Sequence, residues 1–239
     1  MSSVSDPRVV ASTLEAEPAL LPADQLYARL LATAVQHAAG GPPVPRVRVR
    51  SVDRGSEPMP LELWLGAPTP ADDRIVTRSI APVLDVGCGP GRLLEALSAA
   101  GKEALGVDLV PAAVGFARRR GGRAVTGSIF ADVPGSGRWA TALLLDGNIG
   151  IGGRPALLLE RVATLLRPGG DAIVELDPPG YETLRTRVRI ESESLVSEWF
   201  AWARVAADAM EPIAARAGLI TLETFEDDHR WFARLARPR

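Results

Sequence analysis

The start of the chain combines one helical period with one strand period. Apolar residues recur every three or four positions over residues 24–37, which predicts an amphipathic helix. Residues 46–50 alternate arginine with valine, and this period of two predicts a half-exposed strand. Residues 1–22 show no clear period, so we expect a flexible tail there. The pattern therefore predicts an N-terminal cap over residues 23–75, built from one helix and short strands.

Short apolar runs alternate with helical periods through the middle of the chain. Apolar runs of strand length occupy residues 83–86, 104–108, 123–126, 140–145 and 171–176. Helical patterns lie between them, over residues 91–100, 111–120 and 155–166. Because strand and helix alternate, we expect an α/β domain whose parallel sheet carries helices on both faces. Right-handed connections would bring the carboxyl ends of the strands to one edge, where such sheets bind ligands.

Two later segments depart from this alternation. Residues 219–225 and 230–235 are apolar runs joined by a short polar turn, which predicts an antiparallel strand pair near the C-terminus. Residues 181–205 contain two alternating stretches, which predict a β-hairpin inserted above the ligand edge. We therefore expect one domain over residues 76–239 that contains this insertion.

Composition and charge narrow the classes of function. The chain has 239 residues, 46% of them hydrophobic, and a net charge of −2, whereas a domain that grips nucleic acid is usually basic. No apolar stretch approaches the ~20 residues that cross a bilayer. The single cysteine, Cys88, cannot form an internal disulfide, and neither histidine has a companion at metal-ligand spacing. We expect a cytoplasmic protein with no metal, nucleic-acid partner or membrane span.

A glycine-rich segment between the first strand and helix of the α/β domain carries the most specific chemical signal. It reads Asp85-Val86-Gly87-Cys88-Gly89-Pro90-Gly91-Arg92. Glycines in this position let the backbone turn sharply and approach a ligand closely. Asp108 ends the next strand about twenty residues later, where a carboxylate can accept hydrogen bonds from both hydroxyls of a ribose. Together these features predict a ligand that contains a nucleoside.

A dinucleotide site has the same outline, and two details of the loop argue against it. The dinucleotide fingerprint places its third glycine one position further on, where this chain has Arg92. Asp85 stands just before the first glycine and is expected to face the ligand crevice. Its carboxylate would repel a pyrophosphate but pair with an ammonium group. S-adenosylmethionine (SAM) has an ammonium group and no phosphate, so the loop favours SAM.

The segment 85–91, followed by Gly106-Val107-Asp108, resembles the class I SAM-dependent methyltransferases. The resemblance runs from about residue 80 to the C-terminus and includes the turn 166–170 before the fifth strand. It implies a Rossmann-like, mostly parallel seven-stranded sheet with helices on both faces and a C-terminal antiparallel strand pair. It also implies that the aspartate and glycines of the loop hold the methionine part of SAM, while the aspartate of the second strand holds the ribose.

The resemblance implies further contacts to the cofactor. The family usually has an acidic residue after the third strand that contacts the adenine amino group, and Ser128 stands at that position here. Ile129 is expected to pack on the base, and residues 146–153 to line the space between methyl donor and acceptor. The plainer alternative for that loop is a flexible connector. The expected cofactor-binding residues are Asp85, Gly87, Cys88, Gly89, Gly91, Asp108, Leu109, Ser128, Ile129, Asp146 and Gly147.

The inserted hairpin supplies candidates for the acceptor pocket. Its aromatic and arginine side chains are expected to face the crevice; the alternative is that the aromatics are core and the arginines solvated. The expected substrate-binding residues are Asn148, Trp199, Trp202 and Arg204, with Phe200, Arg187 and Arg189 as further candidates. A hydroxyl or ammonium acceptor also has to lose a proton. The candidate bases, chosen by position, are Asp146, Asp177, Tyr181 and Glu175.

One motif invites a different assignment, which we reject. Residues 177–181 read Asp-Pro-Pro-Gly-Tyr, similar to the Asp-Pro-Pro-Tyr motif of enzymes that methylate amino groups of nucleic acids. That motif follows the fourth strand, whereas this one follows the fifth, and Gly180 interrupts it. The sequence therefore predicts a SAM-dependent methyltransferase that acts on a small molecule mainly by positioning. A non-catalytic SAM-binding protein that works through partners and a nucleotide-dependent oxidoreductase remain the alternatives.

Overall fold

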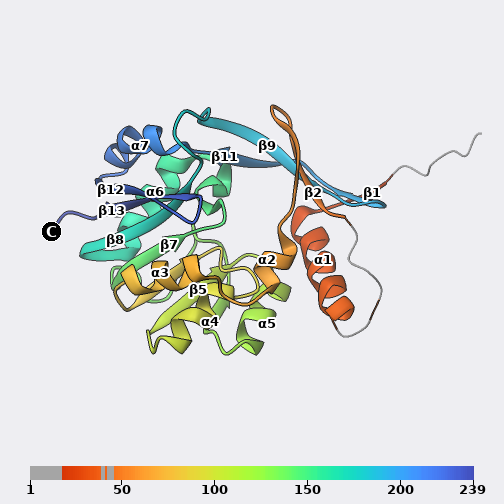
Figure 1. Cartoon of the computed structure of the whole chain (residues 1–239), viewed down its shortest axis with the longest axis horizontal. Coiled ribbons are helices and arrows are strands. Elements are labelled where there is room, and N and C mark those ends of the chain that lie inside the picture. Colours follow the sequence, from red (N-terminus) through yellow and green to blue (C-terminus); the bar gives the residue numbers. More distant parts are fainter. Residues whose placement is uncertain (1–17, 39–40, 42–45) are drawn as a thin grey trace, which may run out of the picture.

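The core of the fold is a seven-stranded sheet that joins the middle of the chain to its C-terminus (Figure 1). The structure, a computed structural model, describes residues 18–38, 41 and 46–239. The strand order is β12-β13-β8-β7-β4-β5-β6. The strands are β4 (Val83–Val86), β5 (Ala104–Asp108), β6 (Ala124–Thr126), β7 (Trp139–Leu144), β8 (Leu166–Leu176), β12 (Ile220–Asp227) and β13 (Arg230–Ala236).

Strand directions agree with the alternating pattern of the sequence. β4, β5, β6, β7 and β8 run parallel. β13 is antiparallel to β8, and β12 is antiparallel to β13. The predicted α/β class, with a mostly parallel seven-stranded sheet and a closing antiparallel pair, is therefore confirmed. This arrangement places the carboxyl ends of the parallel strands at one edge of the sheet.

Helices cover both faces of this sheet. One face carries α3 (Pro70–Arg78), α4 (Arg92–Ala99) and α5 (Pro111–Arg119), and the other carries α6 (Pro155–Leu165) and α7 (Met210–Arg216). Successive residues of β7 serve opposite faces, because Leu143 packs among α3, α4 and α5 whereas Leu144 packs among α6 and α7. Both leucines are fully buried, which contributes ~1.5–3 kcal/mol for each side chain.

The N-terminal cap and the inserted hairpin form one second sheet. Its strands are β1 (Ala19–Leu21), β2 (Arg48–Ser51), β3 (Gly55–Pro58), β9 (Leu184–Glu191), β10 (Leu195–Ser197) and β11 (Phe200–Arg204). β9 lies at its centre and pairs antiparallel with β2, β10 and β11. The β9–β11 pairing agrees with the expected hairpin over residues 181–205. The pairing of that hairpin with the N-terminal strands was not predicted, because a local pattern contains no information about such distant partners.

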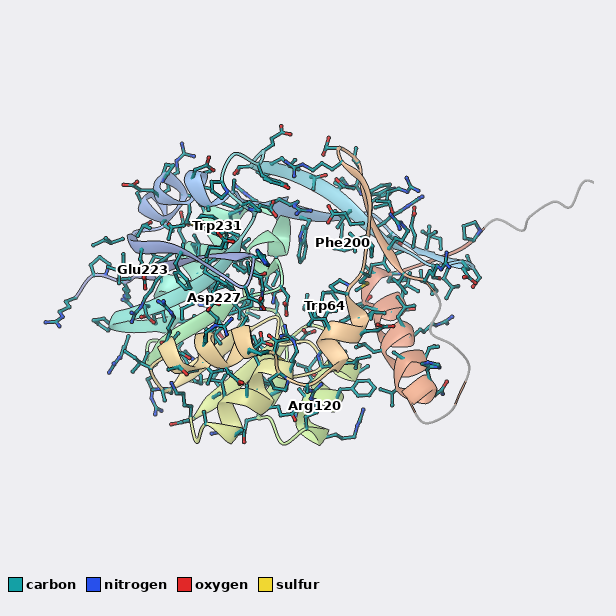
Figure 2. The ribbon with its side chains drawn as sticks, in the orientation of Figure 1. Trp64, Arg120, Phe200, Glu223, Asp227 and Trp231 are labelled. Carbon is teal, nitrogen blue, oxygen red and sulfur yellow. The ribbon has the colours of Figure 1, made fainter. Side chains whose placement is uncertain are left out.

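Two helices, one long and one short, lie between the second sheet and the main domain. α1 (Ala23–Ala38) lies beside this sheet and packs against α5 (Figure 1). α2 (Leu61–Leu65) follows β3. Arg120, which Figure 2 labels, directly follows α5 and donates hydrogen bonds to the carbonyl oxygens of Leu65 and Gly66. It also donates to Glu95 of α4 at 2.6 Å. Arg120 therefore ties the end of α2 to the helices of the main domain.

Three boundaries differ from those expected. β1 lies within the segment 1–22 and pairs with β10, while residues 1–17 fall outside the described part of the chain. α3 crosses the expected boundary between residues 75 and 76. Residues 166–170 begin β8 instead of forming a separate turn. A register shift opposite β7 and a φ of 71° at Gly169 accommodate these extra residues within the strand.

Ion pairs connect α3 to the last strands of the sheet. The Arg74 Nε lies 2.7 Å from both carboxylate oxygens of Asp227, and Arg78 Nη1 lies 3.0 Å from Glu223. Figure 2 shows both acids on β12. These half-exposed pairs contribute only ~0–1 kcal/mol each. They nevertheless align α3 with the C-terminal strand pair, and this alignment positions Asp72 of α3 near the ligand edge.

The part of the chain that the structure describes contains no helix both long and apolar enough to cross a membrane. Within the same residues, no group of three or more His, Cys, Asp or Glu side chains is arranged to hold a metal ion.

Candidate functional site

The loop after β4 turns through glycines with left-handed backbone conformation. Gly87, Gly89 and Gly91 have φ angles of 70°, 51° and 88°, which residues with a Cβ atom rarely adopt. A Cβ atom on Gly91 would lie 2.6 Å from the Cα of Ala117 in α5. The glycines therefore allow α4 to begin directly against α5 at the carboxyl end of β4.

Gly91→Ala is expected to destabilise the domain. The left-handed backbone costs an alanine ~1–2 kcal/mol, and displacing Ala117 adds ~1–3 kcal/mol. We expect urea denaturation to report a free energy of unfolding lower by about 2–5 kcal/mol. Gly121→Ala is the matched control, because Gly121 has a φ of 86° and no atom within 4 Å of its Cβ position. Equal losses in the two variants would contradict the packing argument.

Asp85 is a buried acid in the last but one position of β4. It is 1% exposed, and its Oδ2 accepts no hydrogen bond from the residues that the structure describes. Burial, followed by the nearby Asp146 carboxylate, raises the pKa of Asp85 to about 8. A buried ionised carboxylate requires a paired cation. The free Oδ2 therefore fits an ammonium group, as the sequence predicts for this position.

Asp108 anchors the glycine loop to the next strand. Its Oδ2 accepts a hydrogen bond from the Gly89 amide at 2.9 Å, and its Oδ1 accepts one from the Val110 amide at 2.8 Å. Burial raises the pKa of Asp108, and these two backbone bonds oppose the rise. Each carboxylate oxygen has a second lone pair, so Asp108 retains the capacity to accept ligand hydroxyls while it shapes the loop.

Four side chains of alternating charge form a closed ring close to Asp85; we refer to Asp72, Arg92, Asp146 and Arg230 as the ion-pair ring. Arg92 donates to Asp72 and to both oxygens of Asp146, at 2.9 and 2.7 Å. Arg230 closes the ring through Asp72 at 3.3 Å and Asp146 at 3.4 Å. The Asp72 and Arg92 side chains are 0% and 3% exposed. The ring therefore pairs charges that would be costly to bury alone.

The turn after β7 lies between this ring and the glycine loop. Asp146 has a φ of 53°, and its amide donates to Glu175 of β8 at 2.6 Å. Two residues later, the Asn148 side-chain amide donates to the carbonyl oxygens of Val86 and Gly87, at 2.8 and 3.0 Å. Asn148 was expected to bind substrate. Its side-chain nitrogen instead joins the two loops through these two carbonyl oxygens.

Tyr27 brings α1 to the same place. Its hydroxyl would lie 3.5 Å from a Cβ atom on Gly89, and its ring packs edge-on against Trp64 of α2 at 6.1 Å. Burial, and then the negative charge of Asp108, raise the pKa of the Tyr27 phenol. The phenol is therefore protonated and available as a hydrogen-bond donor beside the glycine loop.

A family model described as a methyltransferase domain matches residues 83–170. The matched stretch runs from β4 into the first residues of β8 and contains the glycine loop, Asp108 and the turn at Asp146. Residues 83–170 therefore resemble a methyltransferase domain, as the sequence motifs predict. The predicted family and fold are thereby confirmed, and SAM is the methyl donor that methyltransferase domains of this class use.

Solved structures share the fold of this methyltransferase domain. A SAM-dependent methyltransferase from Bacteroides fragilis, in complex with S-adenosyl-L-homocysteine, gives a TM-score of 0.72 at 22% identity and covers 93% of this chain and 99% of its own. The 1,6-didemethyltoxoflavin-N1-methyltransferase from Burkholderia thailandensis gives 0.53 at 17%, with 92% of each chain covered. The sugar N-methyltransferase KedS8 from Streptoalloteichus gives 0.53 at 19%, covering 73% of this chain and 88% of its own. None of the curated proteins compared with the sequence matches it.

Two expected cofactor residues of the methyltransferase domain point in different directions. Cys88 is buried, and a Cβ atom on Gly106 would lie 2.6 Å from its Sγ. Its thiol therefore packs on β5, below the loop, and burial raises the pKa of that thiol. Only the Cys88 backbone remains available to a ligand in the loop. Leu109 is 62% exposed at the end of β5, where an apolar side chain can cover a bound base.

The expected adenine contacts need one correction. Ser128 Oγ accepts a hydrogen bond from the Phe130 amide at 3.2 Å. Ile129, which was expected to pack on the base, is 5% exposed and belongs to the core cluster of α6 and β7. The turn instead leaves Phe130 48% exposed. Neighbouring residues of a turn point in different directions, and only the packed structure decides which of two apolar side chains enters the core.

Strand alternation separates the aromatic candidates of the hairpin. Phe200 and Trp202 lie opposite Val188 and Thr186, both buried, so the two rings belong to the inner face of the second sheet. Phe200 and Trp64, both labelled in Figure 2, pack against one apolar cluster that includes residues of α1 and α5. Trp199 belongs to the other face, where the Arg189 guanidinium stacks 4.9 Å from its ring. Trp199 directly precedes β11, and it stacks on Arg189, which points to the opposite face of β9 from Val188, so the structure places Trp199 away from the expected pocket.

Arg204 and Asp177 form a bidentate salt bridge with each other. Arg204 Nε and Nη2 donate to the two oxygens of Asp177 at 2.8 and 2.6 Å, and Arg204 also pairs with Glu57 of β3. This pair locks β11 to the end of β8. Arg204 occupies both carboxylate oxygens of Asp177, so the arrangement argues against Asp177 as the group that accepts the acceptor's proton and against Arg204 as a free ligand for the acceptor.

The other candidate bases are also constrained. The Asp146 carboxylate accepts from Arg92 and Arg230, and Glu175 accepts from Arg230 at 2.8 and 2.7 Å. Burial raises the pKa of Asp146, while the Arg92 guanidinium opposes the rise. Tyr181 is 54% exposed in the turn after β8. None of these groups is presented as a free base beside the glycine loop, which favours catalysis by positioning.

Sequence reasoning missed several contributors to the site. Asp72 and Arg230 lie far from the glycine motif, and Tyr27 lies in the N-terminal helix. A signal existed for Arg92, which stands where a dinucleotide site has glycine, and its charge at the start of a buried helix required a partner. Tyr27 lies next to the apolar stripe of α1, which is typical of an aromatic residue with a polar tip at the edge of a core.

Proposed function

We propose that this chain transfers the methyl group of SAM to a small-molecule acceptor. The observation that carries the proposal is the unpartnered, buried Oδ2 of Asp85 at the carboxyl end of β4. A zwitterionic methionine moiety supplies the ammonium group that this oxygen lacks. Asp108 lies on the neighbouring strand and supports the assignment of the ribose to that side of the site.

SAM, when bound, supplies an activated methyl group on a sulfonium centre. The residues of this chain bind and orient it: Asp85 takes the ammonium group, Asp108 takes the ribose hydroxyls, and the amides of the glycine loop approach the methionine part. Holding donor and nucleophile in line replaces a bimolecular encounter and can supply ~7–11 kcal/mol of the barrier. The arginine-bound state of Asp146, Asp177 and Glu175 is consistent with a mechanism that depends mainly on this positioning.

The second sheet supports an acceptor of small-molecule size. Its inner face carries Phe200 and Trp202, which meet edge-on at 6.0 Å, and Trp64 lies in the same apolar cluster as Phe200. The Trp202 indole also contacts the loop after β7, because a Cβ atom on Gly150 would lie 2.5 Å from its Nε1. These aromatic groups suit a planar or apolar acceptor. The toxoflavin precursor and sugar substrates named for the structural neighbours are of that size class.

Ligand binding separates this function from its alternatives. Calorimetry with S-adenosylhomocysteine (SAH), SAM and NADH is expected to detect the first two and not the third; binding of NADH alone would overturn the proposal. Incubation with labelled SAM and small-molecule extracts is then expected to yield a labelled product. Binding of SAM without any labelled product would favour the non-catalytic alternative, in which the domain works through partners.

Asp108→Ala is expected to weaken SAM binding at least tenfold. Charge-assisted hydrogen bonds contribute ~1.5–3 kcal/mol each, and ~1.4 kcal/mol changes affinity tenfold. Calorimetry at a single pH measures the change. Asp132→Ala, which removes an exposed acid from the loop after β6, is the control and should leave the affinity unchanged. Equal affinities for the wild type and Asp108→Ala would mean that the ribose assignment is wrong.

A further inference from the structure

The ion-pair ring joins parts of the chain that otherwise do not meet at the ligand edge. Asp72 belongs to α3, Arg92 to α4, Asp146 to the turn after β7, and Arg230 to β13. Arg230 also grips Glu175 of β8 with Nε at 2.8 Å and Nη2 at 2.7 Å. Arg230 contacts the side chain of Asp146 directly. It also acts on the backbone of Asp146 through Glu175, which accepts a hydrogen bond from the Asp146 amide.

The held turn is strained and lies next to the glycine loop. Asp146 has a φ of 53° without being glycine, and a residue in that region needs surrounding contacts to keep it there. Asn148, two residues later, bonds the carbonyl oxygens of Val86 and Gly87. A change in the ring therefore reaches the glycine loop through one short segment.

We propose that the ion-pair ring sets the affinity for the cofactor by holding the turn at Asp146 against the glycine loop, with Arg230 as a positioning residue. This inference rests on the proposed function, since it concerns the same cofactor. Of the expected cofactor-binding residues, Arg230 hydrogen-bonds Asp146, and it lies in the last strand, outside the segment that the methyltransferase family model matches. The C-terminal strand pair thereby acts on the cofactor site through a single guanidinium.

The chain offers a matched control for Arg230. Arg234 lies on the same strand, four residues later, and its Nε donates to Asp171 of β8 at 2.6 Å. The two arginines thus make similar pairs with carboxylates on β8, and their side chains are 19% and 27% exposed. Of these two arginines, Arg230 belongs to the ion-pair ring and Arg234 does not. A general loss of stability should affect both variants, whereas a loss of positioning should affect one.

The test compares Arg230→Gln with Arg234→Gln, using SAH as the calorimetric probe. We expect Arg230→Gln to weaken SAH binding about tenfold, as for a lost charged hydrogen bond, and Arg234→Gln to stay within about twofold of the wild type. Arg230→Lys keeps the charge but not the planar guanidinium that can donate two parallel hydrogen bonds. Its SAH affinity should fall between those of the two glutamine variants. If Arg230→Gln does not fold, Arg230→Gln with Glu175→Gln restores the charge balance and should still bind weakly. Wild-type affinity in Arg230→Gln would overturn the inference.

A second readout needs no cofactor and separates this inference from the proposed function. Hydrogen exchange of the segment 144–150 in the empty protein should be faster in Arg230→Gln than in Arg234→Gln. Equal exchange rates in the two variants would contradict the inference that Arg230 holds the turn at Asp146, even if SAH binds. Failure of the wild type to bind SAM or SAH would instead overturn the proposed function, while the exchange result still decides the role of the ring.

The pH profile of SAH binding provides a third readout. The charges of Asp146, Arg92, Asp108 and Asp72 act on the Asp85 carboxyl. Without Arg230, the negative charges of Asp146 and Glu175 are less compensated, so the pKa of Asp85 should rise further. The affinity for SAH should increase with pH as Asp85 ionises. The pH at the midpoint of this increase should therefore be higher in Arg230→Gln and unchanged in Arg234→Gln. An unchanged midpoint in Arg230→Gln would count against the ring as an electrostatic unit.

Discussion

Asp85→Asn should weaken the binding of SAM and SAH on the order of 100-fold, because removing one partner of a buried charge pair costs ~2–5 kcal/mol. Asparagine has the shape of aspartate, so the variant tests charge and not packing. Its side-chain amide also directs a donor toward the ammonium group, which is itself a donor. Calorimetry at pH 7.5 measures the affinity, and an unchanged value would remove the ammonium assignment on which the proposed function depends.

The thermal stability of Asp85→Asn, measured without ligand, provides an independent check of the same argument. Among the described residues, Oδ2 of Asp85 has no hydrogen-bond partner, so replacing the charge of Asp85 should not reduce stability. We expect Asp85→Asn to melt at least as high as the wild type at pH 8.5, where the wild-type carboxyl is largely ionised. Asp171→Asn is the matched control. Asp171 is also buried but is paired with Thr141 and Arg234, so that variant should lose stability and keep its SAH affinity.

The affinity for SAH is expected to rise about twentyfold between pH 6.0 and 7.5, if Asp85 has to ionise before it pairs with the ammonium group. The pKa of Asp85 is raised to about 8 in the empty protein, so the acid is mostly protonated across this range. Binding of the ammonium group then releases a proton. Calorimetry in two buffers of different ionisation enthalpy should detect close to one proton per SAH at pH 7.

The sign of the effect on stability is opposite to that on binding. A carboxyl whose pKa is higher in the folded protein than in the unfolded chain favours folding at low pH, and this contribution is lost as the pH rises from about 4 to about 8. Rising pH should therefore weaken the empty protein while it strengthens the complex. Asp85→Asn should remove the pH dependence of stability and the pH dependence of SAH affinity described above. A flat affinity profile in the wild type would show that Asp85 does not titrate in this window.

Local patterns in the sequence determined the main domain and the centre of the proposed site. Alternating strand and helix periods predicted the parallel sheet, and the number of seven strands followed from the resemblance. The glycine loop, Asp85 and Asp108 could be placed in advance because each lies at the end of a strand, and parallel strands bring those ends together. These features depend on a few consecutive residues, which is the range over which periodicity and turn chemistry operate.

Only the tertiary structure decided which distant residues meet. The N-terminal strands pair with the hairpin around β9, and Asp72, Arg92, Asp146 and Arg230 join into one ring. Which face of β11 turns inward decided that Phe200, not Trp199, lies on the side of the main domain. Strand register and ion pairing between remote segments depend on how whole elements pack. A charge or aromatic group seen in isolation has many possible partners, and packing selects one.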